Sequence, residues 1–236
     1  MSAILGSATL GDICAIACAE AFRHDGQKMV SPMAPIPKLG AQLAQATFAP
    51  DIVLTDGAAT IVDIDGRPEA WMPYSRVFDT AWNGQRHVMM GATQLDRHGN
   101  QNISALGDWK QPKVQLLGVR GSPGNTVYHP TSYFVAKHSQ RVFVEAVDMV
   151  SGVGTDRGAF EIRCVVSNLG VFDFESEDGS MRLRALHPGV SVDDVAAATG
   201  FNVHIAPDVT TSRVPTSEEA QWLDRLDPDH IIRGGI

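Results

Sequence analysis

The sequence GATQLDRHGNQNIS, from Gly91 to Ser104, follows the apolar run of residues 88–90 and is the most informative stretch of the chain. Polar residues Gln94 and Asp96 recur at period two before a polar turn, which is typical of a buried strand that ends there. We expect that strand over residues 87–95. Its end gathers polar groups at the edge where open α/β sheets bind ligands. The alternative is a polar hairpin whose amides satisfy only its own backbone.

Helix and strand patterns alternate on both sides of this stretch. Thr9 and Asp12 have capping-box spacing ahead of an Ala-rich segment, Thr216 and Glu219 repeat that spacing, and Pro32–Pro37 is expected to be a loop that is not helical. The pattern predicts helices or helical turns at 9–23, 39–47, 77–83, 192–199 and 216–226, and strands at 28–31, 52–54, 87–95, 114–119, 142–148, 161–168 and 181–186. This alternation indicates parallel βαβ units, with the last two strands added in antiparallel fashion.

Composition narrows the class of protein. The 236 residues are 44% hydrophobic and 19% charged, and the formal net charge is -8. An acidic chain without clustered Lys and Arg is not expected to bind nucleic acid or an anionic membrane surface. No leader pattern or bilayer-length apolar run is seen, so we expect a cytoplasmic protein with no membrane contact.

The three cysteines do not predict a disulfide framework or a metal site. Cys14 and Cys18 lie four residues apart on the first predicted helix, and Cys164 is distant in sequence. The neighbours of the first two are Ile and Ala, which favours small buried side chains over zinc ligands. We therefore predict no bound metal.

Several blocks of the sequence resemble one protein family. GATQLDRHGNQN is similar to the G-A-x-Q-x-D-x-x-G-N-x-N segment of the β subunit of class I coenzyme A (CoA) transferases. From Ile13 to about Gly189 the chain resembles the β subunit of the two-subunit hydrolases of that superfamily that open the last steroid ring as a CoA thioester. The further matching blocks are FAPDIVLTDG at 48–57, AWMP at 70–73, GVRGSPGNT at 118–126, RVFVEAVDMVSG at 141–152 and VVSNLGVFDF at 165–174.

The resemblance implies a fold and an assembly. The implied fold is the α/β, three-layer, class I CoA-transferase-like fold with a mostly parallel sheet. We expect a single domain over residues 1–236, with its core at about 9–200 and a helical tail at about 200–236. The implied partner is an α subunit in an α2β2 heterotetramer, and the implied substrate is an acyl-CoA. No separate cofactor is expected, because CoA is part of the substrate.

One departure from the transferase pattern bears on the reaction. Class I CoA transferases carry their nucleophilic glutamate in an E-x-G motif, whereas this chain has Thr55-Asp56-Gly57 at that position. The ring-opening hydrolases share this departure, and their catalytic glutamate is on the α subunit. The resemblance thus implies hydrolytic, retro-Claisen cleavage of a carbon-carbon bond in a cyclohexenone carboxyl-CoA during breakdown of steroid rings C and D. Two alternatives stay open: a CoA transferase of the glutaconate or 3-oxoacid type that uses Asp56, and a non-catalytic stabilising subunit.

A second glycine-rich segment is the candidate for stabilising the oxyanion of such a reaction. Gly118–Asn125 (GVRGSPGN) follows a predicted strand, and its three glycines allow close backbone approach. Arg120 is its only basic group and could hold a carboxylate by two hydrogen bonds; a structural ion pair is the alternative. The segment lacks the Lys-Ser or Lys-Thr of a P-loop.

The predicted site combines these segments. We expect Gln94, Arg120 and Asn125 to act in catalysis, and we expect contacts to substrate or CoA from Thr55, Asp56, Gly57, Asp96, Asn100, Asn102, Gly121, Gly124 and Thr126. His98 and His129 flank the two motifs and are candidate proton shuttles. The other six histidines are expected to be structural, because nothing beside them in sequence suggests a nucleophile-base pair; these are His24, His87, His138, His187, His204 and His230.

Overall fold

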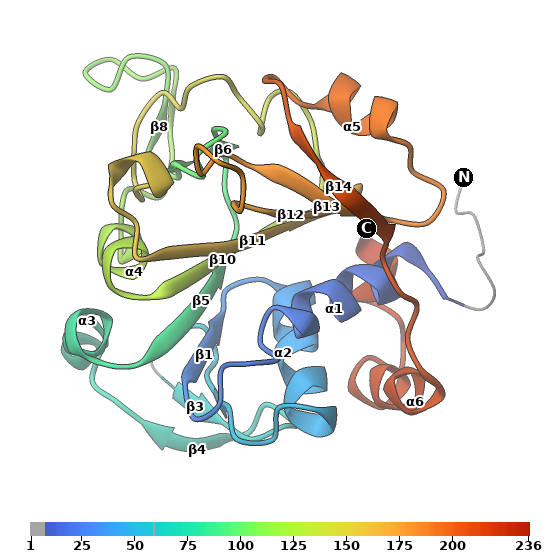
Figure 1. The fold of residues 1–236 in the computed structure, drawn as a ribbon. Coiled ribbons are helices and arrows are strands. Elements are labelled where there is room, and N and C mark those ends of the chain that lie inside the picture. The colour runs from blue at the N-terminus through green and yellow to red at the C-terminus, as the bar shows by residue number, and fades with distance from the viewer. Residues whose placement is uncertain (1–7, 59) are drawn as a thin grey trace.

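The computed structural model describes residues 8–58 and 60–236 and is built around one eight-stranded sheet (Figure 1). The strand order across the sheet is β14-β13-β12-β11-β10-β5-β1-β2. The bounds are Met29–Pro32 for β1, Val53–Leu54 for β2, Arg86–Met90 for β5, Pro130–Val135 for β10, Glu161–Ser167 for β11, Gly170–Asp173 for β12, Arg182–Leu186 for β13 and His204–Thr211 for β14.

Within this sheet β12 is the strand that runs against the others. The pairs from β2 through β1, β5 and β10 to β11 are parallel, β12 is antiparallel to both of its neighbours, and β14 is parallel to β13. The mostly parallel sheet that the sequence predicted is therefore confirmed. The expectation that 161–168 and 181–186 are antiparallel additions is wrong. β12 lies between β11 and β13 and is antiparallel to both, so β11 and β13 run in the same direction as β10.

Two helices cover one face of the sheet, α1 (Leu10–Glu20) and α2 (Pro35–Thr47). The capping box at Thr9 is present as predicted: its side chain accepts from the Asp12 amide, and Asp12 bonds back to the Thr9 amide. The two helices approach closely at Gly40, where an added Cβ would lie 2.7 Å from the Cys18 Cβ. Small buried side chains thus serve helix contact, and all three cysteines are buried and free.

Irregular segments cover the opposite face, together with α5 (Val192–Ala198) (Figure 1). Their short two-stranded sheets pair β6 (Gln94–Leu95) with β7 (Gln101–Asn102), and β8 (Ala105–Leu106) with β9 (Val114–Gln115). A separate hairpin, β3 (Thr60–Val62) with β4 (Pro68–Trp71), lies beyond β2 and precedes α3 (Tyr74–Asn83). The remaining helices are α4 (Ser122–Tyr128) and α6 (Ser217–Leu226), with 3-10 turns at Thr155–Arg157 and Arg233–Gly235.

Several predicted elements differ from those in the structure. The segment 32–37 is not all loop, because α2 begins at Pro35; proline is tolerated in the first helical turn, whose amides lack partners in any case. The strand expected over 87–95 leaves the main sheet after Met90. The strand expected over 114–119 is the two-residue β9. The segment 142–148 forms no strand: it makes one β-bridge, between Phe143 and Leu95, and the Phe143 carbonyl also accepts from the Gly200 amide.

The C-terminal region is joined to the rest of the chain by a strand, a helix and an ion-pair cluster. The segment expected to be a helical tail also contributes β14, so that expectation is wrong for residues 204–211. The capping box of α6 at Thr216 is present as predicted. Arg233 is buried and pairs with Asp12 of α1 at 2.7 Å and with Asp227 at 3.3 Å. Assignment of the whole chain to a single domain stays a prediction.

Candidate active site

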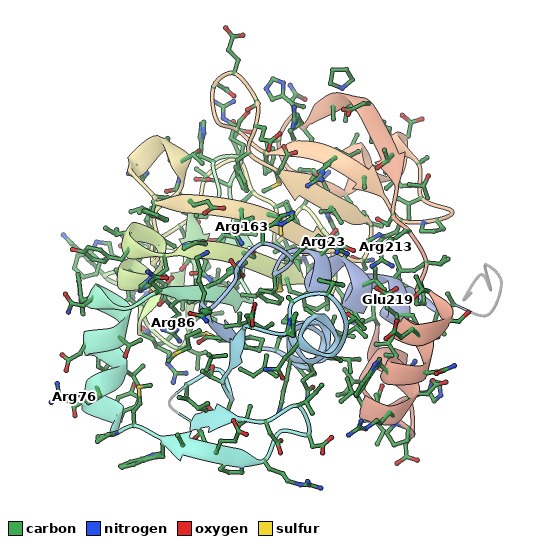
Figure 2. The ribbon with its side chains drawn as sticks, turned by 60° about the horizontal axis from the view of Figure 1, so that its bottom comes forward. Arg23, Arg76, Arg86, Arg163, Arg213 and Glu219 are labelled. Carbon is green, nitrogen blue, oxygen red and sulfur yellow. The ribbon has the colours of Figure 1, made fainter. Side chains whose placement is uncertain are left out.

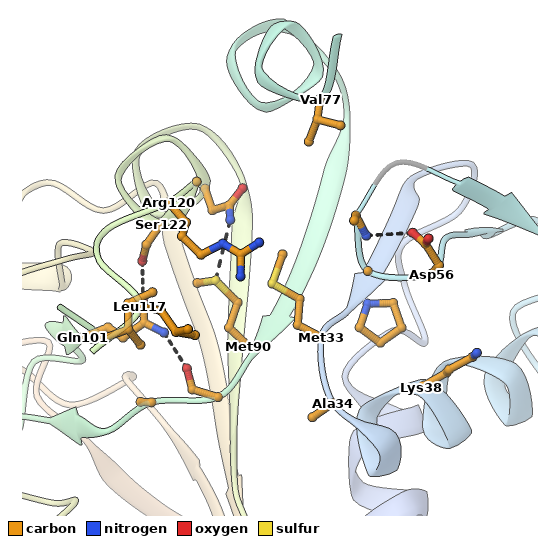
Figure 3. A pocket seen from close by; sticks show the side chains of 18 of the residues that line it. Met33, Ala34, Lys38, Asp56, Val77, Met90, Gln101, Leu117, Arg120 and Ser122 are labelled. Atoms are coloured by element: carbon orange, nitrogen blue, oxygen red, sulfur yellow. Dashed lines mark hydrogen bonds between the residues drawn. The ribbon is translucent and has the colours of Figure 1, made fainter. Parts of the chain in front are cut away.

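A pocket of about 860 Å³ opens on the molecule beside the parallel strands β1, β2 and β5. Its walls come from the turn after β1 and the start of α2, the loop after β2, one side of α3, the segment after β5, and the start of α4. Figure 3 shows Lys38 and Asp56 on one side and Gln101 and Ser122 on the other, with Met90 between them. The location agrees with the rule that open α/β sheets bind ligands beyond the carboxyl ends of their strands.

The lining combines an apolar surface with few charges. Apolar side chains come from Met33, Val77, Phe78, Met90 and Leu117, among others. The charged residues among the described lining are Lys38, Asp56, Arg86 and Arg120, so Asp56 is the one acidic residue there. Such a pocket suits an apolar acyl group with a few polar or anionic attachment points.

Arg86 is the buried charge of this pocket and is not among the site residues predicted from the sequence. It begins β5, is 3% exposed, and lies inside the molecule, in contrast to Arg76 on the outer side of α3 (Figure 2). Its Nε donates to Ser31 Oγ at 2.8 Å and its Nη1 to Asn125 Oδ1 at 3.1 Å. Burial lowers the pKa of Arg86 to about 10, which still leaves the guanidinium charged at neutral pH.

Threonine 55, at the position of the transferase nucleophile, lies beneath the pocket instead of in it. Its side chain is buried. The hydroxyl Oγ1 lies 3.1 Å from both Val30 O and Ser31 Oγ on the neighbouring strand β1 and donates to one of them. Ser31 in turn accepts from Arg86, so a polar chain runs from Thr55 through Ser31 and Arg86 to Asn125. Asp56 and Gly57 do line the pocket, and the Asp56 carboxylate accepts from the Ala58 and Thr60 amides.

The glycine-rich segment 118–125 forms a turn and then a helix. Its last four residues are the first turn of α4, which the sequence pattern did not predict. Arg120 has a positive φ of 49° and lines the pocket together with Gly121 and Asn125. Among the described residues, Arg120 has no carboxylate in ion-pair contact, which argues against a structural ion pair. Gly124 and Thr126 lie further along α4, outside the lining.

Polar side chains of the 91–104 motif mostly bond to one another. Gln94 accepts from the Asp148 amide at 3.0 Å and from Asn102 Nδ2 at 2.7 Å. Asp96 accepts from the His98 and Asn100 amides and from Asn100 Nδ2. These side chains are buried and outside the pocket lining, which instead takes Gly91, Ala92, Thr93, Gln101 and Ile103 from the motif. Gln94, Asp96, Asn100 and Asn102 thus bond within the motif and to the segment 148–156, and their contacts to substrate stay a prediction.

We expect Asp96→Ala to destabilise the fold by about 2 kcal/mol, because buried amide donors of His98 and Asn100 lose their acceptor. Asp96→Asn, which keeps one acceptor oxygen, should lose less. Urea unfolding of both variants measures the difference. An unchanged free energy of unfolding together with a raised KM in the active complex would instead assign Asp96 to substrate binding.

The histidines do not join the pocket. His98 and His129 are absent from its lining, and His98 Nδ1 is buried with no hydrogen bond to the described residues. The reason given for a structural His87 was wrong, because this buried ring lies 2.5 Å from Asp25 Oδ2 and 2.9 Å from Ser132 Oγ. All three side chains are buried on the α1 side of the sheet, so the cluster connects strands and is closed to substrate.

Comparison with known proteins gives the class first. The coenzyme A transferase family model matches residues 77–198, slightly more than half of the chain. The chain belongs to the coenzyme A transferase family.

Within that family the chain is about half identical to a group of hydrolase subunits. The chain is 52% identical to the cholesterol ring-cleaving hydrolase IpdB subunit of Mycobacterium tuberculosis, over 97% of this chain and 94% of that protein. It is 49% identical to the subunit of the same name from Rhodococcus jostii, over 97% and 96%. The crystal structure of Rhodococcus jostii IpdAB superposes with a TM-score of 0.92 at 47% identity, over 98% of this chain and 99% of that one. The fold expected from the resemblance is confirmed.

Proposed function

We propose that this chain is the β subunit of a cholesterol ring-cleaving hydrolase and that it works with an α subunit. The reaction is hydrolytic opening of the last steroid ring in a cyclohexenone carboxyl-CoA thioester. Sequence identity of about half to two IpdB subunits supports the assignment. The observation that carries it is the pocket itself: it offers cationic and neutral donors, while the nucleophile position holds the buried Thr55.

In this proposal a carboxylate of the α subunit activates water, and water adds to the ring ketone. Collapse of the adduct forms the new carboxyl group and breaks the carbon-carbon bond, and the electron pair stays on the carbon next to the thioester as an enolate. That carbon then takes the proton that the α-subunit carboxylate removed from water. Donors aimed at the thioester oxygen stabilise that charge. The Gly118–Asn125 turn and Arg120 border the pocket and suit this role. Gln94 lies outside the lining, and we assign it to positioning the motif through Asn102 and Asp148.

The partner surface is proposed from exposed apolar side chains around the pocket. Tyr74 and Phe78 of α3, Leu117 and Val119 lie at or beside its rim and are exposed, Leu117 to 75%. Trp71 of β4 precedes α3 and is 71% exposed. Large exposed apolar patches are typical of subunit interfaces. An α subunit seated there would close the pocket in an α2β2 heterotetramer.

The proposed compartment is the cytoplasm. Over residues 8–58 and 60–236, none of the helices has the length and apolar character needed to cross a membrane. An acyl-CoA is a charged, water-soluble thioester, which suits an aqueous compartment.

Two substitutions separate the hydrolase from the transferase alternative. Thr55→Ala should keep more than about a tenth of the activity of the αβ complex, a barrier change below about 1.4 kcal/mol, since no covalent role falls to Thr55. Asp56→Asn should also keep turnover, and hydroxylamine or borohydride should trap no adduct on this chain. Loss of turnover in Asp56→Asn, with an adduct mapped to Asp56 in the parent enzyme, would establish the transferase instead.

A further inference from the structure

One residue of the pocket lining comes from a distant part of the chain. The other described lining residues all lie between positions 32 and 125, whereas Ile232 belongs to the turn of residues 227–235 that follows α6. Ile232 is partly buried and packs against the core that α1 and α2 bury on one face of the sheet. Figure 3 shows Ala34, at the start of α2, across the pocket from Arg120. Ile232 therefore adds apolar surface on the α2 side of the pocket.

Three carboxylates hold this turn in place through Arg233. The buried guanidinium pairs with Asp12 of α1 at 2.7 Å, with Asp224 at 3.0 Å and with Asp227 at 3.3 Å. The Asp227 carboxylate also accepts from the backbone amides of Ile232 and Arg233, at 3.2 and 3.0 Å. Breaking a buried ion-pair network leaves uncompensated charges and is strongly destabilising. The network thus keeps the turn, and Ile232 with it, in one position.

The first turn of α1 is shaped to receive the 227–235 turn. A Cβ at Gly11 would lie 2.7 Å from the carbonyl carbon and the Cα of Arg233, closer than real Cβ atoms approach a backbone. Glycine is otherwise a poor helix former, so its presence in this helix points to the contact. The next residue, Asp12, uses one carboxylate oxygen for the Thr9 capping box and the other for Arg233. Helix capping and docking of the turn therefore share one side chain.

We propose that Ile232 is a specificity-determining residue of the pocket, which limits the size of the alkyl substituent on the acyl ring, and that Arg233 is the positioning residue that holds it. The inference rests on the proposed function, because it places the acyl group of the ring-opening reaction in this pocket. An apolar wall discriminates by fit, and one methylene too many or too few in such a pocket changes kcat/KM by about 10- to 200-fold.

The position of Ile232 favours contact with the acyl ring over contact with the thioester. Arg120 and the Gly118–Asn125 turn, which suit the thioester oxygen, border the other side of the pocket. A ring substituent that points away from the thioester would face the α2 side. Met33 and Pro35, next to the start of α2, add apolar surface to the same lining.

The test uses two cyclohexenone carboxyl-CoA thioesters that differ only in one alkyl substituent of the ring, methyl in one and butyl in the other. The readout is the ratio of kcat/KM for the butyl substrate to that for the methyl substrate, with the reconstituted αβ complex. Ile232→Ala should raise this ratio about tenfold, because the pocket gains room, and Ile232→Phe should lower it about tenfold. A general loss of stability does not produce opposite shifts. Ile231→Ala is the matched control: Ile231 is 76% exposed and outside the lining, so the ratio should not change.

Arg233→Met tests the positioning role. It should shift the ratio in the same direction as Ile232→Ala, because the turn is released. Arg225→Met, which removes an exposed arginine of α6 that pairs with Asp65, should leave the ratio unchanged. A folded Arg233→Met complex with the ratio of the parent would overturn the positioning role, and if this variant does not fold, the two Ile232 variants decide the inference.

The outcomes separate the inference from the proposed function. An unchanged ratio in both Ile232 variants, or a shift in the same direction in both, would overturn the specificity role while ring opening by the parent complex upholds the proposed function. Failure of the parent complex to open either ring would overturn the proposed function, and the inference with it.

Discussion

Purified alone, this chain is expected to open no ring, and addition of its α subunit should raise the rate by more than a thousandfold. The reason is the composition of the pocket, where Asp56 is the one acidic side chain among the described lining residues and already accepts two backbone amides. A positioned general base that activates water accounts for rate factors of about 10² to 10⁴. Steady-state ring opening, followed by mass spectrometry of the product, measures the difference.

The control for partner dependence is a complex with a variant α subunit, in which the acidic residue proposed to activate water is replaced by the corresponding amide residue. That complex should assemble and stay inactive, which separates assembly from chemistry. Sedimentation of the isolated chain should also reveal self-association, because apolar side chains such as Leu117 and Trp71 are exposed. Full activity of a monodisperse single chain would contradict the shared active site.

A second large effect is expected from acid, through two buried histidines outside the site. His138 stacks on Phe143 at 3.6 Å and contacts Ser167 and Thr199, and His187 contacts Ser167 and Ser212. Burial lowers the pKa of each from 6.5 to about 4. The unfolded chain therefore binds more protons than the folded one between these values, so stability falls as the pH drops from about 6.5 toward 4.

The pH effect amounts to as much as about 3 kcal/mol for each histidine, at about 1.4 kcal/mol per pKa unit. Urea unfolding of the chain at pH 7 and at pH 4.5 gives the total. The double variant His138→Gln, His187→Gln should lose less stability than the parent over this range, while His24→Gln, at an exposed position, should not alter the slope. An equal slope in the double variant would show that other groups carry the acid sensitivity.

Local patterns predicted the helix starts that carry a capping box, because capping is decided within four residues. Thr9 and Thr216 both cap as their spacing indicated. The central strand β10 escaped prediction because its sequence PTSYFV begins with polar residues. Ser132 is buried there with hydrogen-bond partners that are remote in sequence, His87 Nε2 and Cys164 Sγ. Hydrogen bonds between residues that are far apart in the chain leave no signal in the local sequence.

The candidate site shows the same difference between what local sequence patterns predict and what depends on long-range contacts. Motif matching located the segments that border the pocket, including Asp56, Arg120 and Asn125. It did not separate side chains that face the pocket from those that turn inward, such as Asp96 and Asn102, because a hairpin presents polar residues to either side. Arg86 had one usable signal, a charged residue at the start of a strongly apolar run, yet its lack of a counter-ion is visible only in three dimensions.

The most direct test of the central claim is turnover of the reconstituted complex in water enriched in oxygen-18. Hydrolytic carbon-carbon cleavage predicts one oxygen-18 atom in the newly formed carboxylate, an intact CoA thioester in the same product, and no covalent adduct on this chain. The contradicting result is transfer of CoA to an added acid, with a trapped acyl or CoA adduct on Asp56 and no ring opening.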